Sequence, residues 1–155
     1  MLDIYIDADS CPFKKEVYKV ANRYLLKVFV ASNTWMKIPE EKRFVLKLVN
    51  DELDAADNWI IENVQNDDIV ITADIPMANQ CLKKGAFVIG AKGTQLTKNN
   101  ISDLMATRDL LTELRSTGEI TSGPSPLRKV DRSNFLQQMD QIVQKVHSQN
   151  KHKTP

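Results

Sequence analysis

Apolar residues in the first 90 positions alternate between short unbroken runs and longer stretches in which they recur every three or four residues. Short runs bounded by polar residues are typical of buried strands, and the longer period is typical of helices packed on one face. The periodic stretches predict helices from Pro12 to Leu25, over residues 54–64, and over residues 76–84 before Gly85. The short runs predict strands at residues 2–7, 28–31, 44–49, 69–73 and 87–89.

The alternation of strands and helices predicts an α/β fold with a mainly parallel five-stranded sheet and helices on both faces. The pattern changes after residue 90. A polar loop over 90–99 precedes a helix over 101–116, a Gly- and Pro-containing loop over 119–132, and an amphipathic helix over 134–147. We therefore predict one domain over 1–147, with a core at 1–90 and a helical appendage at 91–147 that closes over the acidic edge of the sheet. The basic tail at 148–155 is predicted to be disordered.

Composition narrows the class of protein. With 155 residues, of which 42% are hydrophobic and 26% charged, the chain can bury the core of one domain. A net charge of +1 gives no general attraction for nucleic acid, so such binding would need a local basic patch. The two cysteines are far apart, which excludes a disulfide framework and a C-x-x-C zinc site. No apolar stretch is long enough to span a bilayer, and we expect a reducing cytoplasmic location.

Five aspartates mark the ends and starts of these elements. Asp7 and Asp9 follow the first strand, Asp74 follows the fourth, and Asp54 and Asp57 open the second helix. The carboxyl ends of parallel strands meet at one edge of a sheet, so these side chains should converge there. Crowded carboxylates raise one another's pKa, and Mg²⁺ or Mn²⁺ would relieve that repulsion. Taken singly, Asp54 or Asp9 could equally be a helix cap.

Polar and basic residues near these acids are candidates for contacts with a substrate. Thr72 and Asn33 lie near strand ends and could orient a water molecule or a phosphate oxygen. Basic side chains would position a phosphate backbone. Each is more simply explained as a surface charge, and Arg108 could instead form an ion pair with Asp109. The basic candidates are Lys14, Lys92, Arg108 and Arg132.

Several segments resemble the YaiI/YqxD family of uncharacterised bacterial proteins, over roughly residues 1–140 and in the same order. They are residues 4–12, 54–57, 67–76, 97–101, 108–109, 114–118, 123–124 and 131–132. The chain departs from the usual family pattern at Ser122, at Leu127-Arg128 and at Ala91-Lys92. The family is similar in architecture to PIN-like nuclease domains, and the resemblance implies that Asp7, Asp57 and Asp74 match the acids of those nucleases.

The expected function is divalent-metal-dependent hydrolysis of phosphodiesters in RNA, or less readily in DNA. Asp7, Asp57 and Asp74 would be the catalytic acids, and Asp9 and Asp54 would complete the ligands of Mg²⁺ or Mn²⁺. One alternative is a nucleic-acid- or nucleotide-binding module without catalysis. Another is a phosphatase of the haloacid-dehalogenase type, in which Asp7 attacks phosphorus and Asp9 acts as acid and base. Cys11 occupies a position where that class expects Thr or Val.

Two further residue types have an alternative interpretation. Cys11 at a helix start could be a reactive thiolate, although a buried apolar role fits better because no histidine lies nearby in the sequence. Cys81 and Trp59 are predicted to be core residues. Trp35 could stack on a nucleobase, but with aromatic residues at 6% of the chain we expect packing instead.

Overall fold

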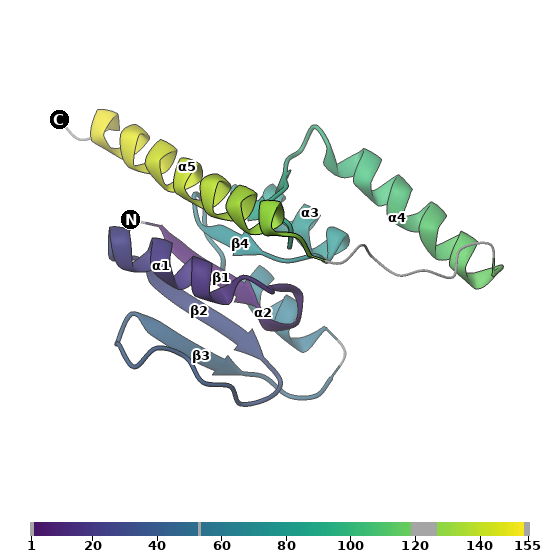
Figure 1. Ribbon diagram of the computed structural model, residues 1–155, viewed down its shortest axis with the longest axis horizontal. Helices are drawn as coiled ribbons and strands as arrows, with labels where there is room; N and C mark the ends of the chain where they lie inside the picture. Colours follow the sequence, from purple (N-terminus) through teal and green to yellow (C-terminus); the bar gives the residue numbers. More distant parts are fainter. Residues whose placement is uncertain (1, 53, 119–126, 154–155) are drawn as a thin grey trace.

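A six-stranded sheet lies between two layers of helices in the computed structural model, which describes residues 2–52, 54–118 and 127–153 (Figure 1). The strand order is β3-β2-β1-β4-β5-β6, and every pairing is parallel except that of β5 with β6. The strands are β1 (Asp3–Asp7), β2 (Lys27–Ser32), β3 (Phe44–Leu48), β4 (Ile69–Ile71), β5 (Phe87–Ile89) and β6 (Gln95–Leu96). The mainly parallel α/β fold is confirmed. The strand count of five was wrong, because two-residue β6 lies in the predicted polar loop and has no apolar run of its own.

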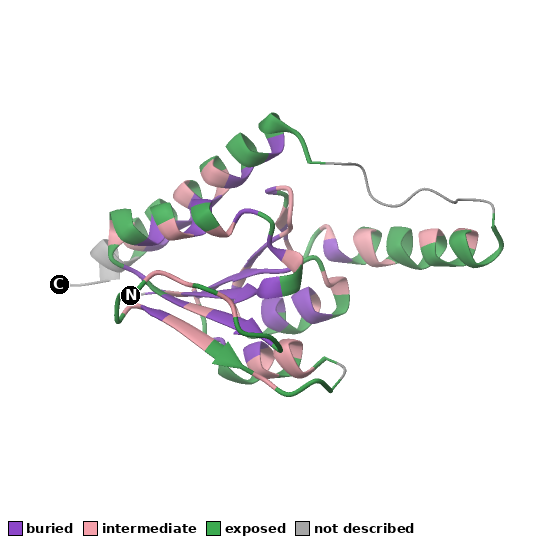
Figure 2. Ribbon diagram, turned by 60° about the horizontal axis from the view of Figure 1, so that its bottom comes forward, coloured by how far each residue is buried: buried purple, intermediate pink, exposed green. Residues whose placement is uncertain are grey.

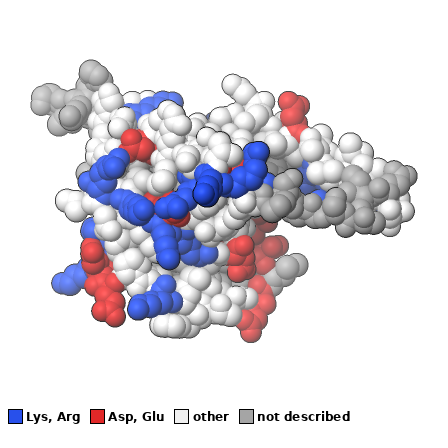
Figure 3. Space-filling model, in the orientation of Figure 1, with Lys and Arg blue, Asp and Glu red and all other residues white. Residues whose placement is uncertain are grey.

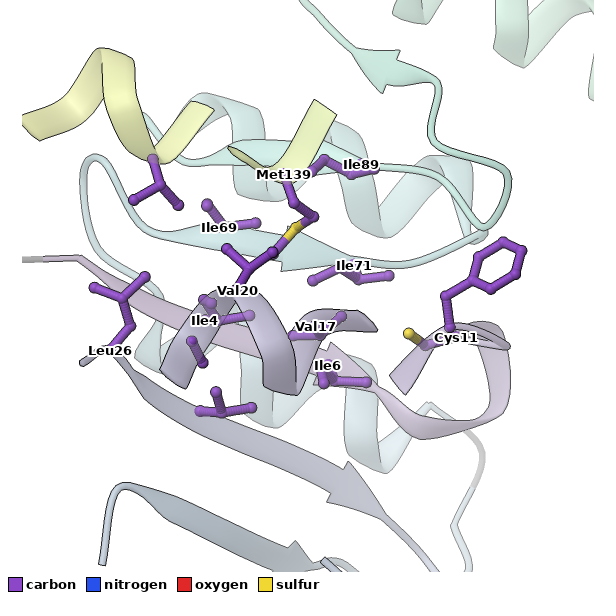
Figure 4. Close-up of a cluster of buried hydrophobic side chains, with 14 of the residues drawn as sticks. Ile4, Ile6, Cys11, Val17, Val20, Leu26, Ile69, Ile71, Ile89 and Met139 are labelled. Atoms are coloured by element: carbon purple, nitrogen blue, oxygen red, sulfur yellow. The ribbon is translucent and has the colours of Figure 1, made fainter. Parts of the chain in front are cut away.

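The helices divide between the two faces of the sheet. On one face, α1 (Lys14–Tyr24) and α5 (Lys129–Lys153) enclose the core shown in Figure 4, with Ile4 and Ile71 from the sheet and Val17 from α1. On the other face, α2 (Ala55–Asn63) and α3 (Ile75–Lys83) cover a second core. Cys81 belongs to that core, as predicted, and Trp59 packs against it. Among the described residues, no helix is both long enough and apolar enough to cross a membrane.

Helix α5 is part of the core, although the sequence predicted an appendage. It begins at Lys129, inside the predicted loop, and it continues to Lys153 through residues predicted to be disordered. Its inward side chains pack against α1 and β5 and join the core that contains Ile4, Ile69 and Ile71, which would otherwise be less well shielded from water. These buried residues of α5 are Phe135, Met139, Ile142, Val143 and Val146.

Helix α4 (Ile101–Ser116) extends away from the sheet (Figures 1 and 2). Ile101 is buried and Leu104 packs on the α3 side, but Met105, Leu111 and Leu114 are only half-buried. The apolar residues at helical spacing in this segment predict a buried stripe, and that expectation was wrong beyond the first turn. In these views α4 does not cover the acidic edge. Most of the predicted 119–132 loop lies outside the described residues.

The chain reverses its direction across the sheet between β1 and β4. From β1 it adds β2 and β3 on one side, and then returns to place β4 on the other side of β1. In open α/β sheets, ligands bind beyond the carboxyl ends of the strands at such a reversal. The residues that follow β1 and β4 are therefore those best placed to form a site.

Candidate metal centre

Asp7 and Thr72 meet at the carboxyl ends of the two central strands. Ile6 pairs with Ile71 in parallel register, so the next residue of each strand lies beside the other. The Thr72 hydroxyl donates a hydrogen bond to Asp7 Oδ2 at 3.1 Å, and the Ser10 hydroxyl donates to the same oxygen at 3.0 Å. Asp7 is buried, and burial raises the pKa of its carboxyl group while these two hydrogen bonds oppose the rise. Its other carboxylate oxygen remains for a cation or a proton.

Asp74 is oriented by both of its neighbours in the turn before α3. Its backbone N–H donates to Thr72 Oγ1 at 3.1 Å, and its Oδ1 accepts the Met77 N–H at 3.0 Å. The side chain therefore caps α3 and is held in one direction. Capping and metal binding are compatible here, because a carboxylate has a second oxygen with free lone pairs.

Asp54 and Asp57 approach Asp74 from the start of α2. One carboxylate oxygen from each of the three residues lies within 4.8 Å of the others. Burial, a hydrogen bond with Asp74 and the negative charges of Asp7, Asp74 and Asp54 together raise the pKa of Asp57 to about 7. The three carboxylates are close enough to repel one another, and a divalent cation bound between them would reduce that repulsion.

Asp54 does not cap α2, so the capping interpretation was wrong. Its side chain makes no capping hydrogen bond, although it occupies the cap position. Its backbone is left-handed, with φ of 63°, which a non-glycine residue adopts at some cost in conformational energy. Strained backbone of this kind often occurs beside functional sites.

The acids line an open hollow of about 310 Å³ at the carboxyl edge of the sheet. A second hollow of about 190 Å³, between α2 and α3, shares Asp54, Asp57 and Asp74 with the first. These three acids therefore lie between two solvent-accessible hollows. The larger hollow is lined by Asp7, Asp9, Ser10, Asn33, Val49, Asn50, Asp51, Glu52, Asp54, Ala55, Ala56, Asp57 and Asp74. It thus contains all five predicted aspartates and Asn33.

Most of the predicted basic contacts have other structural roles. Lys14 Nζ donates to the carbonyls of Ala8 and Cys11, both at 2.7 Å, and so holds the turn η1 (Ala8–Ser10). Arg132 Nε lies 2.7 Å from Glu16 Oε1 and joins α5 to α1.

The last two candidates do not line the hollow either. Arg108 is exposed on α4, with its guanidinium 3.5 Å from Asp109, as the alternative interpretation predicted. Lys92 is half-buried and is also absent from the lining. None of the four predicted basic residues therefore lines the hollow.

Sequence reasoning missed two contributions to the site. It did not single out Ser10 as a donor to Asp7, nor the residues from Val49 to Asp51 as part of the lining. The signal for Val49 to Asp51 was available, because these residues end or directly follow the strand predicted at 44–49 and so reach the same edge. Cys11 is buried and its pKa is raised to about 11 by burial, which confirms the apolar interpretation.

Thr72 positions acids rather than substrate, since its side chain is fully buried. We expect Thr72→Val to weaken Mn²⁺ affinity by about 10- to 100-fold, because both Asp7 and Asp74 lose a partner that orients them. The variant should also lower the free energy of unfolding by about 1–3 kcal/mol. Calorimetry and urea unfolding measure the two effects. Thr94→Val, at an exposed position, is the matched control, and equal results for both variants would contradict the positioning role.

Comparison with known proteins identifies the family of this chain. A family model described as "Uncharacterized BCR, YaiI/YqxD family" matches residues 5–145. The chain belongs to the YaiI/YqxD family. It is 46% identical over 143 residues to the UPF0178 protein amb2838 of Paramagnetospirillum magneticum, covering 92% of this chain and 95% of that one. It is 47% identical over 146 residues to a UPF0178 protein of a Caulobacter species, covering 94% and 97%.

The family name gives no activity, and the names of these relatives give none either. No solved structure matches the chain. What the family members do must therefore be inferred from the chemistry of the site.

Proposed function

We propose that this protein is a divalent-metal-dependent nuclease that hydrolyses phosphodiester bonds, with RNA proposed ahead of DNA as its substrate. The observation that supports it most is that Asp54, Asp57 and Asp74 each place a carboxylate oxygen within 4.8 Å of the other two. The elevated pKa of Asp57 agrees, since burial and the neighbouring acids both disfavour its charged form, which a cation would stabilise. The PIN-like resemblance of the family supports the same conclusion from the order of the acids in the sequence.

The side chains present suit Mg²⁺ or Mn²⁺. Hard cations take carboxylate oxygens and keep several waters, and the open hollow leaves room for both water and phosphate. Asp54, Asp57 and Asp74 would hold the ion, with Asp7 and Asp9 completing the ligands or holding a second one. A bound ion would lower the pKa of a water molecule and neutralise charge on the phosphate. The residues of this chain would fix the acids in place, through Thr72, Ser10 and the Met77 N–H.

The phosphatase alternative is less well supported. A nucleophilic Asp7 would have to approach phosphorus, yet it is 6% exposed and one of its oxygens accepts two hydrogen bonds. The alternative of a nucleic-acid- or nucleotide-binding module uses the same site and differs from our proposal only in that the bound strand is not cut. We retain the cytoplasm as the proposed location, where Cys11 and Cys81 would remain the free thiols that they are here.

The metal affinity should rise with pH up to about pH 7. The ligand form of Asp57 is the carboxylate, and its pKa of about 7 means that binding must displace a proton below that pH. We expect the Mn²⁺ association constant to increase by up to about tenfold per pH unit between pH 5 and 7, and then to level off. Calorimetric titration from pH 5 to 8.5 measures it. A constant affinity over that range would contradict the assignment of Asp57 as a ligand.

Cleavage is tested with labelled single-stranded RNA and DNA, with Mn²⁺ or with EDTA. Our proposal expects products with Mn²⁺ and none with EDTA. If Mn²⁺ binds at this site but neither substrate is cut, the non-catalytic alternative is supported and the nuclease proposal fails.

A further inference from the structure

Trp35 is the most exposed large apolar residue in the described part of the chain, with 74% of its surface accessible. The prediction that it packs in the protein was therefore wrong. Its loop is nevertheless well anchored. The Ser32 hydroxyl bonds to the Thr34 carbonyl at 2.8 Å and accepts the Thr34 N–H at 3.1 Å. Met36 and Ile38 pack against the α1 side of the core. The indole is thus presented to solvent from a fixed backbone.

Trp35 lies two positions along the chain from a residue of the acidic hollow. Asn33 lines that hollow. The Cα atoms of Asn33 and Trp35 are two peptide units apart and so at most about 7.6 Å from each other. Leu48 lies beside Ser32 in the β2–β3 register and is half exposed, and the next residue, Val49, lines the hollow. Trp35, Leu48 and Val49 are therefore apolar residues that line the hollow or lie within two residues of one that does. The planar face of a nucleobase suits such a surface.

Basic side chains gather on the face of the sheet that α1 and α5 cover. Figure 3 shows Lys and Arg gathered in a band over α1 and the adjoining part of α5, with acidic side chains at the edge beside it. We define the basic band as the exposed residues Lys15, Lys19, Arg23, Arg128, Lys129 and Arg132.

The band contains two lysines that suit a chain of phosphates. Lys15 and Lys19 are one helical turn apart on the same face of α1, and α1 follows Ser10, which lines the hollow. The described residues place no carboxylate within ion-pair distance of either amino group. Both amino groups can therefore take phosphates without first breaking an ion pair.

We propose that the substrate is a single-stranded nucleic acid, held with one base stacked on Trp35 and its backbone phosphates on Lys15 and Lys19. This inference rests on the proposed nuclease function, which assigns cleavage of the bound strand to the acidic hollow. A duplex keeps its bases stacked on one another, so only an unpaired base can lie against the indole. The lysines attract any phosphate backbone, and Trp35 selects the single strand.

Fluorescence titration with a 12-nucleotide oligothymidylate tests the proposal, in Ca²⁺, which takes carboxylate ligands. Strand length is checked on a gel afterwards. We expect the strand to quench tryptophan fluorescence in the wild type and to bind at least tenfold more tightly than a duplex of equal length. Trp35→Phe should bind with similar affinity but without quenching, because the other tryptophan, Trp59, packs against the second core. Trp35→Ala should bind about 5- to 150-fold more weakly, the range of one base–aromatic stack.

Charge reversal tests the lysines. Lys15→Glu/Lys19→Glu should bind more weakly, and the slope of log affinity against log salt should fall by about 1.4, for two phosphates on a single strand. Lys83→Glu/Lys98→Glu makes the same change at exposed positions, with Lys83 on the opposite face of the sheet, and should bind as the wild type does. Equal affinity of wild type and Trp35→Ala, or equal binding of strand and duplex, would overturn the proposal.

Metal calorimetry separates this inference from the proposed function. Trp35→Ala should bind Mn²⁺ as the wild type does. A wild type that binds Mn²⁺ but no strand overturns the inference and leaves the metal centre. A wild type that binds the strand through Trp35 but no Mn²⁺ supports the surface and overturns the nuclease.

Discussion

Asp57→Asn should weaken Mn²⁺ binding by at least about 100-fold and remove detectable strand cleavage. Burial and the surrounding acids raise the pKa of Asp57 to about 7. A bound cation would therefore stabilise the carboxylate of Asp57 strongly. Asparagine keeps the size of the side chain but removes the charge. Calorimetry and the cleavage assay measure the two losses.

The control for this prediction lies in the same hollow. Asp51→Asn removes an equal charge from the lining but lies outside the three-acid cluster, so it should change Mn²⁺ affinity by no more than about threefold. Equal losses in both variants would mean that the hollow attracts cations only by its general charge.

Stability gives an independent signature of the same substitution. The carboxyl of Asp57 has a higher pKa in the folded protein than in the unfolded chain, where it is about 3.9, so the folded state binds more protons between pH 4 and 7. The free energy of unfolding therefore falls as pH rises through that window. In EDTA at pH 8, Asp57→Asn should unfold at a higher temperature than the wild type, by about 2–4 °C for each 1 kcal/mol recovered. A lower Tm would mean that the loss of binding reflects damage to the fold.

Phe135→Ala should lower the free energy of unfolding by about 3–5 kcal/mol, the usual cost of emptying a buried aromatic site. Phe135 is fully buried on α5, and its ring centroid lies 5.3 Å from that of Phe13. Gly93, with φ of +90°, also approaches the Phe135 backbone closely, and a Cβ there would lie 2.6 Å from its nitrogen. The loss of the ring therefore leaves a cavity beside Phe13, and the close contact of Gly93 with the Phe135 backbone keeps α5 from moving to fill it.

Urea unfolding measures this loss, and Val130→Ala is the control on the same helix. Val130 is 47% exposed, so its truncation should change stability by no more than about 0.5 kcal/mol. If the two variants were equally stable, α5 would be a peripheral helix, as the sequence alone suggested.

The parallel core and the acidic edge could be predicted from sequence because each depends on local signals. Apolar runs ending in Asp7 and Asp74 identify both the strands and the edge where their ends meet. The placement of α5 could not be predicted in this way, since helical periodicity shows which side of a helix is apolar but not what that side covers. Met105, Leu111 and Leu114 show the converse case, in which a periodic stripe on α4 stays half-buried.

The detail inside the site also depends on contacts distant in sequence. Thr72 looked like a group for orienting water, and only its buried position beside Asp7 reveals a positioning role. Lys14 and Arg132 have the charge expected of phosphate ligands, but a backbone carbonyl pair and Glu16 occupy them. Exposed Trp35 was misread because aromatic residues are usually buried, and sequence composition does not report accessibility.

The pairing of β1 with β4 has a consequence for the chain while it is being synthesised. Asp7 follows β1 and Asp74 follows β4, so the two carboxylates come together only when β4 pairs with β1. Helix α2, which carries Asp57 and begins after Asp54, lies between these strands in the sequence. A nascent chain on the ribosome has no complete acid cluster until β4 has emerged and entered the sheet. A nuclease built in this way would stay inert toward the messenger and ribosomal RNA around it throughout the first half of its own translation.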